Sequence, residues 1–269
     1  MDDPRLNGRT SEAFGGFAEA RPSKPHPDLD RQWLCTMSDS DTHHHADRPD
    51  APARTVEVSI PPLGVAGSLR LPTAPRAVVV FAHGSGSSRL SPRNVYVAEA
   101  LNRSGIATLL FDLLTSDEEA DRANVFDIPL LAGRLISALS WISDGPETAS
   151  LRIGLFGAST GAAAALVAAA SLEGQVGAVV SRGGRPDLAG PALDRVRAPT
   201  LLIVGGNDRD VLALNRQALE RLPASSELRV IPGASHLFPE PGALDAVVAE
   251  ARAWFQQHLI APTGSRPGD

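Results

Sequence analysis

The chain has 269 residues, of which 43% are hydrophobic, so it is long and apolar enough for one large α/β domain or two small ones. Its formal net charge of −6 leaves no basic footprint, and we expect no nucleic-acid partner. No apolar run approaches the about 20 residues of a membrane span, and the N-terminus lacks the regions of a secretory signal. The sequence therefore predicts a cytoplasmic protein without a membrane partner.

Cysteine and lysine each occur only once, and both fall near the N-terminus. Cys35 is the single cysteine, which excludes an internal disulfide and a Cys-rich metal site. Lys24 is the single lysine, so the predicted domain lacks a Schiff-base lysine and the lysine of a P-loop. A tract of three histidines at 43–45 has either metal-binding potential or the role of a solvated tail, and the absence of a second ligand cluster favours the tail. We expect no cofactor and no metal.

The two ends of the chain differ in composition from its middle. Residues 1–52 mix Pro, Asp, Arg, Ser and Gly without an apolar period, which predicts a disordered N-terminal leader. Met1 and Met37 are both candidate start sites. Residues 53–261 are predicted to form one α/β domain, and residues 262–269 a flexible polar tail.

Short β-rich runs alternate with helical ones along this domain. Strands are predicted at residues 55–60, 67–71, 76–82, 106–111, 152–157, 177–181, 200–204 and 228–231, and helices at 91–103, 130–142, 162–170 and in the C-terminal segment with Leu244, Val247, Val248, Ala251 and Phe255 on its core face. The first two strands read as an antiparallel pair. The alternation predicts an eight-stranded, mostly parallel sheet with helices on both faces. The segment between residues 181 and 200 is too short for a lid domain.

The junction after the fifth predicted strand fits a nucleophile elbow. Gly157, Ser159 and Gly161 match G-x-S-x-G, in which a strained strand-to-helix turn holds a serine hydroxyl above the sheet. The glycines are required because side chains there would collide across the tight turn. The alternative is a chance match at the start of a small-residue helix, so the decision depends on partner residues elsewhere.

A serine nucleophile needs a base, and the predicted domain has three histidines. His258 lies at the far end of the last helix and His83 precedes a glycine-rich loop, so neither is well placed. His236 follows the last strand, at the same sheet edge as Ser159, and is the predicted base. The alternative for His236 is a capping or core histidine.

The acid that orients the base should follow the preceding strand. Asp208 and Asp210 both do, and we favour Asp208 because Asp210 is the natural cap of a helix beginning near Val211. The alternative is that either aspartate only caps this helix. Ser159, Asp208 and His236 then occur in the chain order Ser, Asp, His.

Two backbone amides are predicted to stabilise the oxyanion, those of Ser85 and Thr160. Ser85 lies in the loop after the third strand, and Thr160 follows the nucleophile. A rival interpretation of this loop is a dinucleotide fingerprint, with Gly84 and Gly86 as two of its three glycines. Arg89 occupies the third position and no acid follows at the required distance, so we reject it.

These motifs resemble the α/β-hydrolase superfamily over residues 77–259, and within it the dienelactone hydrolase-like branch. The resemblance is carried by residues 81–86, 157–161, 205–208 and 233–236. Residues 109–115 and 181–187 further resemble the hydrolase domain that some bacteria fuse to a phosphoribosyltransferase. Dienelactone hydrolases proper use a cysteine nucleophile, whereas this chain has Ser159, so dienelactone itself is not the expected substrate.

The resemblance and the predicted triad together imply a serine hydrolase with the α/β-hydrolase fold. Its expected reaction is cleavage of a small ester, lactone or thioester through an acyl-serine intermediate. An acyltransferase or perhydrolase using the same site is an alternative, since only the acyl acceptor differs. A binding module that retains the fold is a non-enzymatic alternative.

Four arginines follow strand ends at the predicted ligand-binding edge of the sheet. They are Arg89, Arg93, Arg182 and Arg185. Because arginine matches carboxylate and phosphate geometry, these residues predict an anionic small-molecule substrate. The alternative is that some of them only pair with Asp112 or Asp187.

Overall fold

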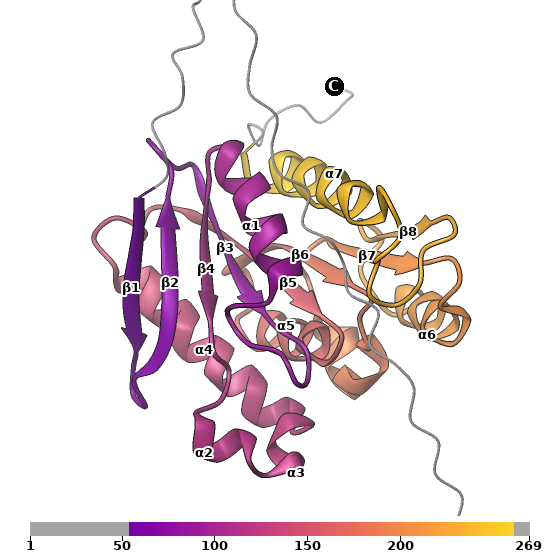
Figure 1. Cartoon of the computed structure of the whole chain (residues 1–269), viewed down its shortest axis with the longest axis horizontal. Coiled ribbons are helices and arrows are strands. Elements are labelled where there is room, and N and C mark those ends of the chain that lie inside the picture. Colours follow the sequence, from indigo (N-terminus) through magenta and orange to yellow (C-terminus); the bar gives the residue numbers. More distant parts are fainter. Residues whose placement is uncertain (1–53, 261–269) are drawn as a thin grey trace, which may run out of the picture. The chain divides into compact units, whose positions relative to one another are not determined.

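A computed structural model describes residues 54–260 (Figure 1). The predictions made for residues 1–52, including Lys24, Cys35 and the histidine tract 43–45, lie outside the described residues. The same holds for the tail at 262–269.

The described chain is built on one eight-stranded sheet. Its strands are β1 (Arg54–Ile60), β2 (Val65–Leu71), β3 (Ala77–Ala82), β4 (Ile106–Phe111), β5 (Arg152–Ala158), β6 (Val176–Arg182), β7 (Thr200–Gly205) and β8 (Glu227–Ile231). Their spatial order is β1-β2-β4-β3-β5-β6-β7-β8. The β1–β2 and β2–β4 pairs are antiparallel and all others are parallel, which confirms the predicted mostly parallel sheet.

Sequence hydrophobicity explains where each strand lies in the sheet. The inner strands β3, β4 and β7 are mostly apolar and are buried at every position, as expected of strands covered on both faces. The edge strand β1 instead alternates exposed with partly buried residues, because only one of its faces meets the core.

Helices cover both faces of this sheet (Figure 1). The regular helices are α1 (Pro92–Arg103), α2 (Ser116–Glu119), α3 (Arg122–Val125), α4 (Ile128–Asp144), α5 (Thr160–Ser171), α6 (Arg209–Leu219) and α7 (Ala243–Phe255), with a 3-10 helix η1 (Pro186–Arg195) and a π-helix η2 (Gln256–Ile260). One apolar core includes Leu135 of α4 and Leu166 of α5, and the other includes Val97 of α1 and Val247 of α7. Within residues 54–260, no helix has the length and apolarity needed to cross a membrane.

The starts of two helices test the capping predictions. Asp127 caps α4 by accepting a hydrogen bond from the amide of Leu130, and this helix begins at Ile128, two residues before its predicted start at 130. The prediction for α6 was wrong by two residues, since this helix begins at Arg209 and not near Val211. Its N-cap position belongs to Asp208, and Asp210 lies inside the first turn.

The sequence prediction also missed α2 and α3, which lie between β4 and α4. Thr115 and Glu118 form a capping box, each side chain bonding to the backbone amide of the other residue. Neither helix has a buried residue, and Arg134 of α4 holds Glu118 by an ion pair. Without an apolar stripe, these helices carry no periodic signal.

Candidate active site

Ser159 lies on a strained turn between β5 and α5. Its φ is 51°, in the left-handed region that residues with a side chain seldom adopt. A Cβ added at Gly157 would lie 2.4 Å from Cα of Ala162, and one at Gly161 would lie 2.3 Å from the carbonyl oxygen of Ala82. The turn therefore needs glycine on both sides of the serine, as the sequence predicts.

His236 and Asp208 form a direct hydrogen bond. Nδ1 of His236 lies 2.6 Å from Oδ2 of Asp208. The aspartate side chain is 15% exposed and the histidine side chain is 39% exposed. Because Nδ1 is held by the carboxylate, Nε2 is the ring nitrogen that remains for proton transfer.

The loops that carry these two residues are fixed to each other through their backbones. The amide of Asn207 donates to the carbonyl oxygen of Ala234 at 2.9 Å, and its side-chain amide donates to that of Gly233 at 2.8 Å. A Cβ added at Gly205 would lie 2.4 Å from the Ala234 carbonyl oxygen. This close approach after β7 and β8 sets the position of the aspartate relative to the histidine.

The end of β6 brings Ser159 and His236 to one place. The amide of Ser159 donates to the carbonyl oxygen of Arg182 at 3.3 Å. At the next residue, Gly183, an added Cβ would lie 3.6 Å from Cε1 of His236. The three residues of the predicted triad thus gather at the carboxyl edge of the sheet. Within residues 54–260 the Ser159 hydroxyl makes no hydrogen bond to His236, a bond that often tightens only with substrate bound.

The other two histidines of the domain have structural environments. Nε2 of His83 accepts a hydrogen bond from the amide of Leu113 at 3.1 Å, so Nδ1 carries the proton and donates to the carbonyl oxygen of Gly84. Burial lowers the pKa of His83 and favours its neutral form. His258 packs against Trp254 with ring centroids 4.2 Å apart.

Ser85 and Thr160, the predicted oxyanion donors, are in direct contact. The amide of Ser85 donates to Oγ1 of Thr160 at 3.0 Å, so in this structure that donor is already engaged. A Cβ added at Gly84 would lie 2.9 Å from Cβ of Ser159, which places the Ser85 loop against the nucleophile. Thr160 is the first residue of α5, and amides of a first helical turn have no partner within the helix.

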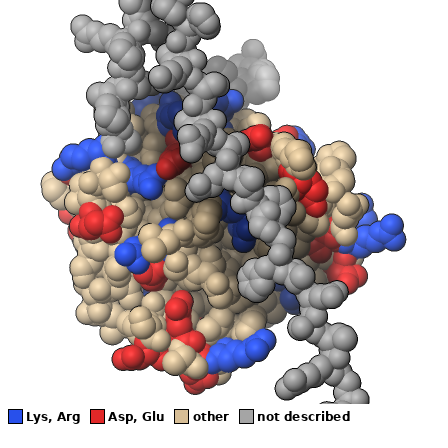
Figure 2. Space-filling model, in the orientation of Figure 1, with Lys and Arg blue, Asp and Glu red and all other residues tan. Residues whose placement is uncertain are grey.

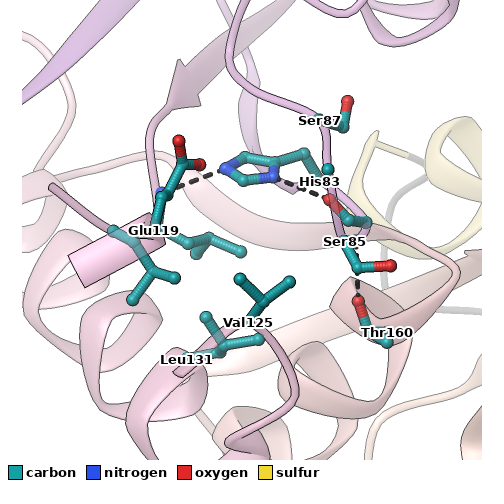
Figure 3. A pocket seen from close by; sticks show the side chains of 11 residues that line it. His83, Ser85, Ser87, Glu119, Val125, Leu131 and Thr160 are labelled. Carbon is teal, nitrogen blue, oxygen red and sulfur yellow. Dashed lines mark hydrogen bonds between the residues drawn. The ribbon is translucent and has the colours of Figure 1, made fainter. Parts of the chain in front are cut away.

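A small pocket opens beside these donors (Figure 3). It has a volume of about 10 Å³, and its lining includes Ser85, Thr160, Val125 and Leu131. A wider groove of about 350 Å³ adjoins it, between the Ser85 loop and the α2–α3 segment, with Phe126 in its lining. The small pocket has a mainly apolar lining, whereas the groove also presents the charged side chains of Glu119 and Arg122.

The four predicted arginines differ in their contacts, and two of them form ion pairs with nearby aspartates. Arg89 pairs with Asp112, and Arg185 with Asp187, both at 2.7 Å. These two pairs confirm the alternative that some of the arginines serve to neutralise local carboxylates. Within residues 54–260, Arg93 and Arg182 have no ion pair with an acidic residue.

The described residues contain no candidate metal centre. Between residues 54 and 260, no group of three or more His, Cys, Asp or Glu side chains gathers in a way that could hold a metal ion.

The sheet order, the elbow serine and the hydrogen-bonded His–Asp pair together define an α/β-hydrolase. The family model described as "Dienelactone hydrolase family" matches residues 65–259, more than two thirds of the chain. The chain belongs to the dienelactone hydrolase family and is accordingly a hydrolase.

Known relatives agree with this assignment. The crystal structure of a dienelactone hydrolase from Anabaena variabilis is 55% identical, with a TM-score of 0.73, over 77% of this chain and 98% of that one. Est1E from Butyrivibrio proteoclasticus has a TM-score of 0.62 at 15% identity, over 76% of this chain and 98% of its own, and shows the fold alone.

A longer relative accounts for the resemblance to a fused hydrolase domain. A putative phosphoribosyl transferase from Mycobacterium tuberculosis is 60% identical over 215 residues, which is 79% of this chain and 48% of that protein. The chain thus spans about half the length of the curated relatives that it matches.

Proposed function

We propose that the protein hydrolyses a small ester, lactone or thioester through an acyl-serine intermediate on Ser159. The observation that supports this most directly is the 2.6 Å hydrogen bond between Nδ1 of His236 and Oδ2 of Asp208, beside a serine at φ 51°. A carboxylate bound to Nδ1 fixes the histidine tautomer in which Nε2 can accept a proton.

In the first half-reaction, Oγ of Ser159 attacks the acyl carbon while its proton passes to Nε2 of His236. The resulting imidazolium is stabilised by Asp208, which stays ionised. The tetrahedral intermediate then collapses, the bond to the leaving alcohol or thiol breaks, and His236 returns the proton to that leaving group.

In the second half-reaction, water attacks the acyl-serine and gives its proton to His236. Collapse of this second intermediate releases the carboxylic acid, and the proton on His236 goes back to Oγ of Ser159. An acyltransferase or a perhydrolase would differ only here, where another acceptor or hydrogen peroxide replaces water.

The backbone amides of Thr160 and Ser85 supply the oxyanion donors in this proposal. The Ser85 amide must exchange its bond to the neutral Thr160 hydroxyl for a bond to the oxyanion. This exchange is favourable because hydrogen bonds to an ionised acceptor are about twice as strong as neutral ones.

The test is hydrolysis of a panel of activated aryl esters of increasing acyl length by the wild type and by Ser159→Ala. We expect turnover that Ser159→Ala abolishes, and a burst of aryl alcohol equal to the enzyme present when deacylation is slow. A fluorophosphonate should label the wild type and not Ser159→Ala. Absence of both turnover and labelling in the wild type would favour the binding-module alternative.

Product analysis separates the two enzymatic alternatives. Reactions run with added alcohol or hydrogen peroxide should still release mainly the free acid if water is the acceptor. Predominant formation of a new ester or a peracid would instead identify an acyltransferase or a perhydrolase.

A further inference from the structure

Arg182 has an environment unlike that of other charged residues in the described chain. It is the last residue of β6 and is 7% exposed, and within residues 54–260 it is the only buried Asp, Glu, Lys or Arg. Its Nη1 atom is buried without a hydrogen-bond partner. A buried cation with an unsatisfied donor is unfavourable unless an anion occupies the space beside it.

The charged neighbour of Arg182 is a second cation, Arg93, in the first turn of α1. Burial first, and then the charge of Arg93, lowers the pKa of Arg182 to about 10, so the Arg182 side chain remains positive at neutral pH. Nε of Arg93 is also buried without a partner. Figure 2 shows recessed basic atoms near the middle of this face, where Figure 1 places the start of α1 in front of the sheet.

Arg182 lies next to the nucleophile along the backbone. The carbonyl oxygen of Arg182 accepts from the amide of Ser159 at 3.3 Å. Side chains two residues apart in a strand share a face, and Val180 packs in the α1–α7 core, so Arg182 points to that face. The apolar pocket with Leu131 belongs to the opposite, α4 side of the sheet.

We propose that Arg93 and Arg182 bind an anionic group of the substrate, a carboxylate or a phosphate, next to Ser159. This inference rests on the hydrolase activity proposed above, because the anion site is expected to select the substrate of that reaction. The substrate then spans Ser159, with its anionic group on the α1 side and its uncharged part toward the α4 side of the sheet. Two guanidinium groups can bind either a carboxylate or a phosphate through several parallel hydrogen bonds.

Binding is tested without turnover in the full-length Ser159→Ala protein. Sodium succinate and sodium phosphate are titrated calorimetrically, with sodium chloride as the control for ionic strength. We expect saturable binding of at least one of the two, weakened about tenfold or more by Arg93→Met and by Arg182→Met. The anion that binds more tightly shows whether the site prefers a carboxylate or a phosphate. Arg103→Met, at the other end of α1, removes an exposed arginine and should retain the affinity.

Turnover is tested with two aryl esters that differ in charge, the monoester of succinic acid and the ester of 4-methylpentanoic acid. We expect the wild type to favour the succinyl ester in kcat/KM, with the preference shrinking as salt rises. Arg93→Met and Arg182→Met should each reduce this preference about tenfold, whereas Arg103→Met should keep it.

The outcomes separate the two proposals. Absence of anion binding, or binding that neither Arg93→Met nor Arg182→Met weakens, would overturn the anion site. Equal turnover of the two esters would overturn its role in substrate selection. Full esterase activity in Ser159→Ala would instead contradict the proposed mechanism, while arginine-dependent anion binding would stand. Melting temperatures of all variants identify any that fail to fold, and the two arginine variants serve as independent tests.

Discussion

The carboxylate of Asp208 occupies the N-cap position of α6 and bonds to His236 instead of to the helix. An aspartate at this position usually accepts a hydrogen bond from an amide of the first turn. Here the side chain makes no such bond, so α6 lacks that stabilisation. The side chain therefore does not cap the helix, and its bond to His236 supports our proposal that it orients the histidine.

Substitution of this aspartate should therefore affect catalysis far more than folding. Asp208→Asn is expected to lower kcat about 10³- to 10⁴-fold, because an amide stabilises the wrong histidine tautomer and no imidazolium. Asp210→Asn is the control, since Asp210 is exposed in the first turn of α6 and should cost less than about 1 kcal/mol through the helix dipole. Steady-state kinetics and thermal melts measure both effects, and a reversed order would refute our assignment of the acid.

Two glycines within helices should respond in opposite ways to alanine. Gly161→Ala would place a Cβ 2.3 Å from the Ala82 carbonyl oxygen and 2.4 Å from that of His83, so we expect a loss of at least about 2 kcal/mol. At Gly133 in α4 an added Cβ would meet nothing within 4 Å, and Gly133→Ala should gain about 0.5–1 kcal/mol. Urea unfolding gives both values. If both variants changed the free energy of unfolding equally, the turn at Ser159 would have to accept the extra methyl group without a steric clash.

The loop that carries Ser85 should be equally intolerant of added volume near the nucleophile. In Gly84→Ala the new methyl group would lie 2.9 Å from Cβ of Ser159 and 3.1 Å from the Ala158 carbonyl oxygen. We expect the loop to shift and kcat/KM to fall about 10- to 100-fold, since small displacements of oriented groups cost this much. An unchanged kcat/KM with a folded protein would show that the loop does not assist the reaction.

Glu240 links stability to pH in the loop that carries His236. Its Oε1 accepts from the amide of Ser235 at 2.9 Å. Hydrogen bonding by the side chain of Ser235, and to a smaller extent by backbone amides, holds the pKa of Glu240 below its ordinary value of 4.5. A lowered folded-state pKa means that the stabilisation is present above pH 4.5 and is lost as the pH falls below it. Glu240→Gln should therefore melt at a lower temperature than the wild type at pH 7.

The difference between these two proteins is the informative quantity, because acid affects many other carboxylates in both. Their melting temperatures should converge below the ordinary pKa of glutamate, where the wild-type side chain becomes neutral like glutamine. A constant difference from about pH 7 to about pH 3 would show that the charge of Glu240 is not involved.

Most of the sheet was predictable because its strands are local apolar runs. The predicted strand at 106–111 has the bounds of β4, and the other strands differ from prediction by one or two residues at their ends. The antiparallel pairing of β2 with β4 was not predicted, since it joins segments about 40 residues apart and depends on the assembled sheet.

The candidate site was predictable where function imposes a local pattern. Gly157, Ser159 and Gly161 are adjacent in sequence, and the His236 and Asp208 loops directly follow strands. The start of α6 was misplaced because Asp210 fits a cap by residue type alone, and only the structure shows that Asp208 holds the N-cap position while its side chain bonds to His236.

Pairing among the arginines could not be predicted from spacing. Arg182 and Arg185 are three residues apart, yet the first ends a buried strand and the second lies in a loop beside Asp187. Whether a cation meets an acid, solvent or another cation depends on side-chain direction and long-range packing. The capping box of Thr115 and Glu118, by contrast, was a local signal that identifies α2 once it is sought.

The α2–α3 segment is the outer wall of the groove beside Ser85, and it contributes no buried residue to either core. Segments held by few buried contacts open at a free-energy cost far below that of global unfolding. Amide hydrogen exchange should accordingly be faster in residues 116–125 than in β3 or β5. Under the proposed mechanism, substitutions in this wall would alter which acyl groups are admitted while leaving Ser159, Asp208 and His236 untouched, so substrate range and catalytic power can diverge independently over evolution.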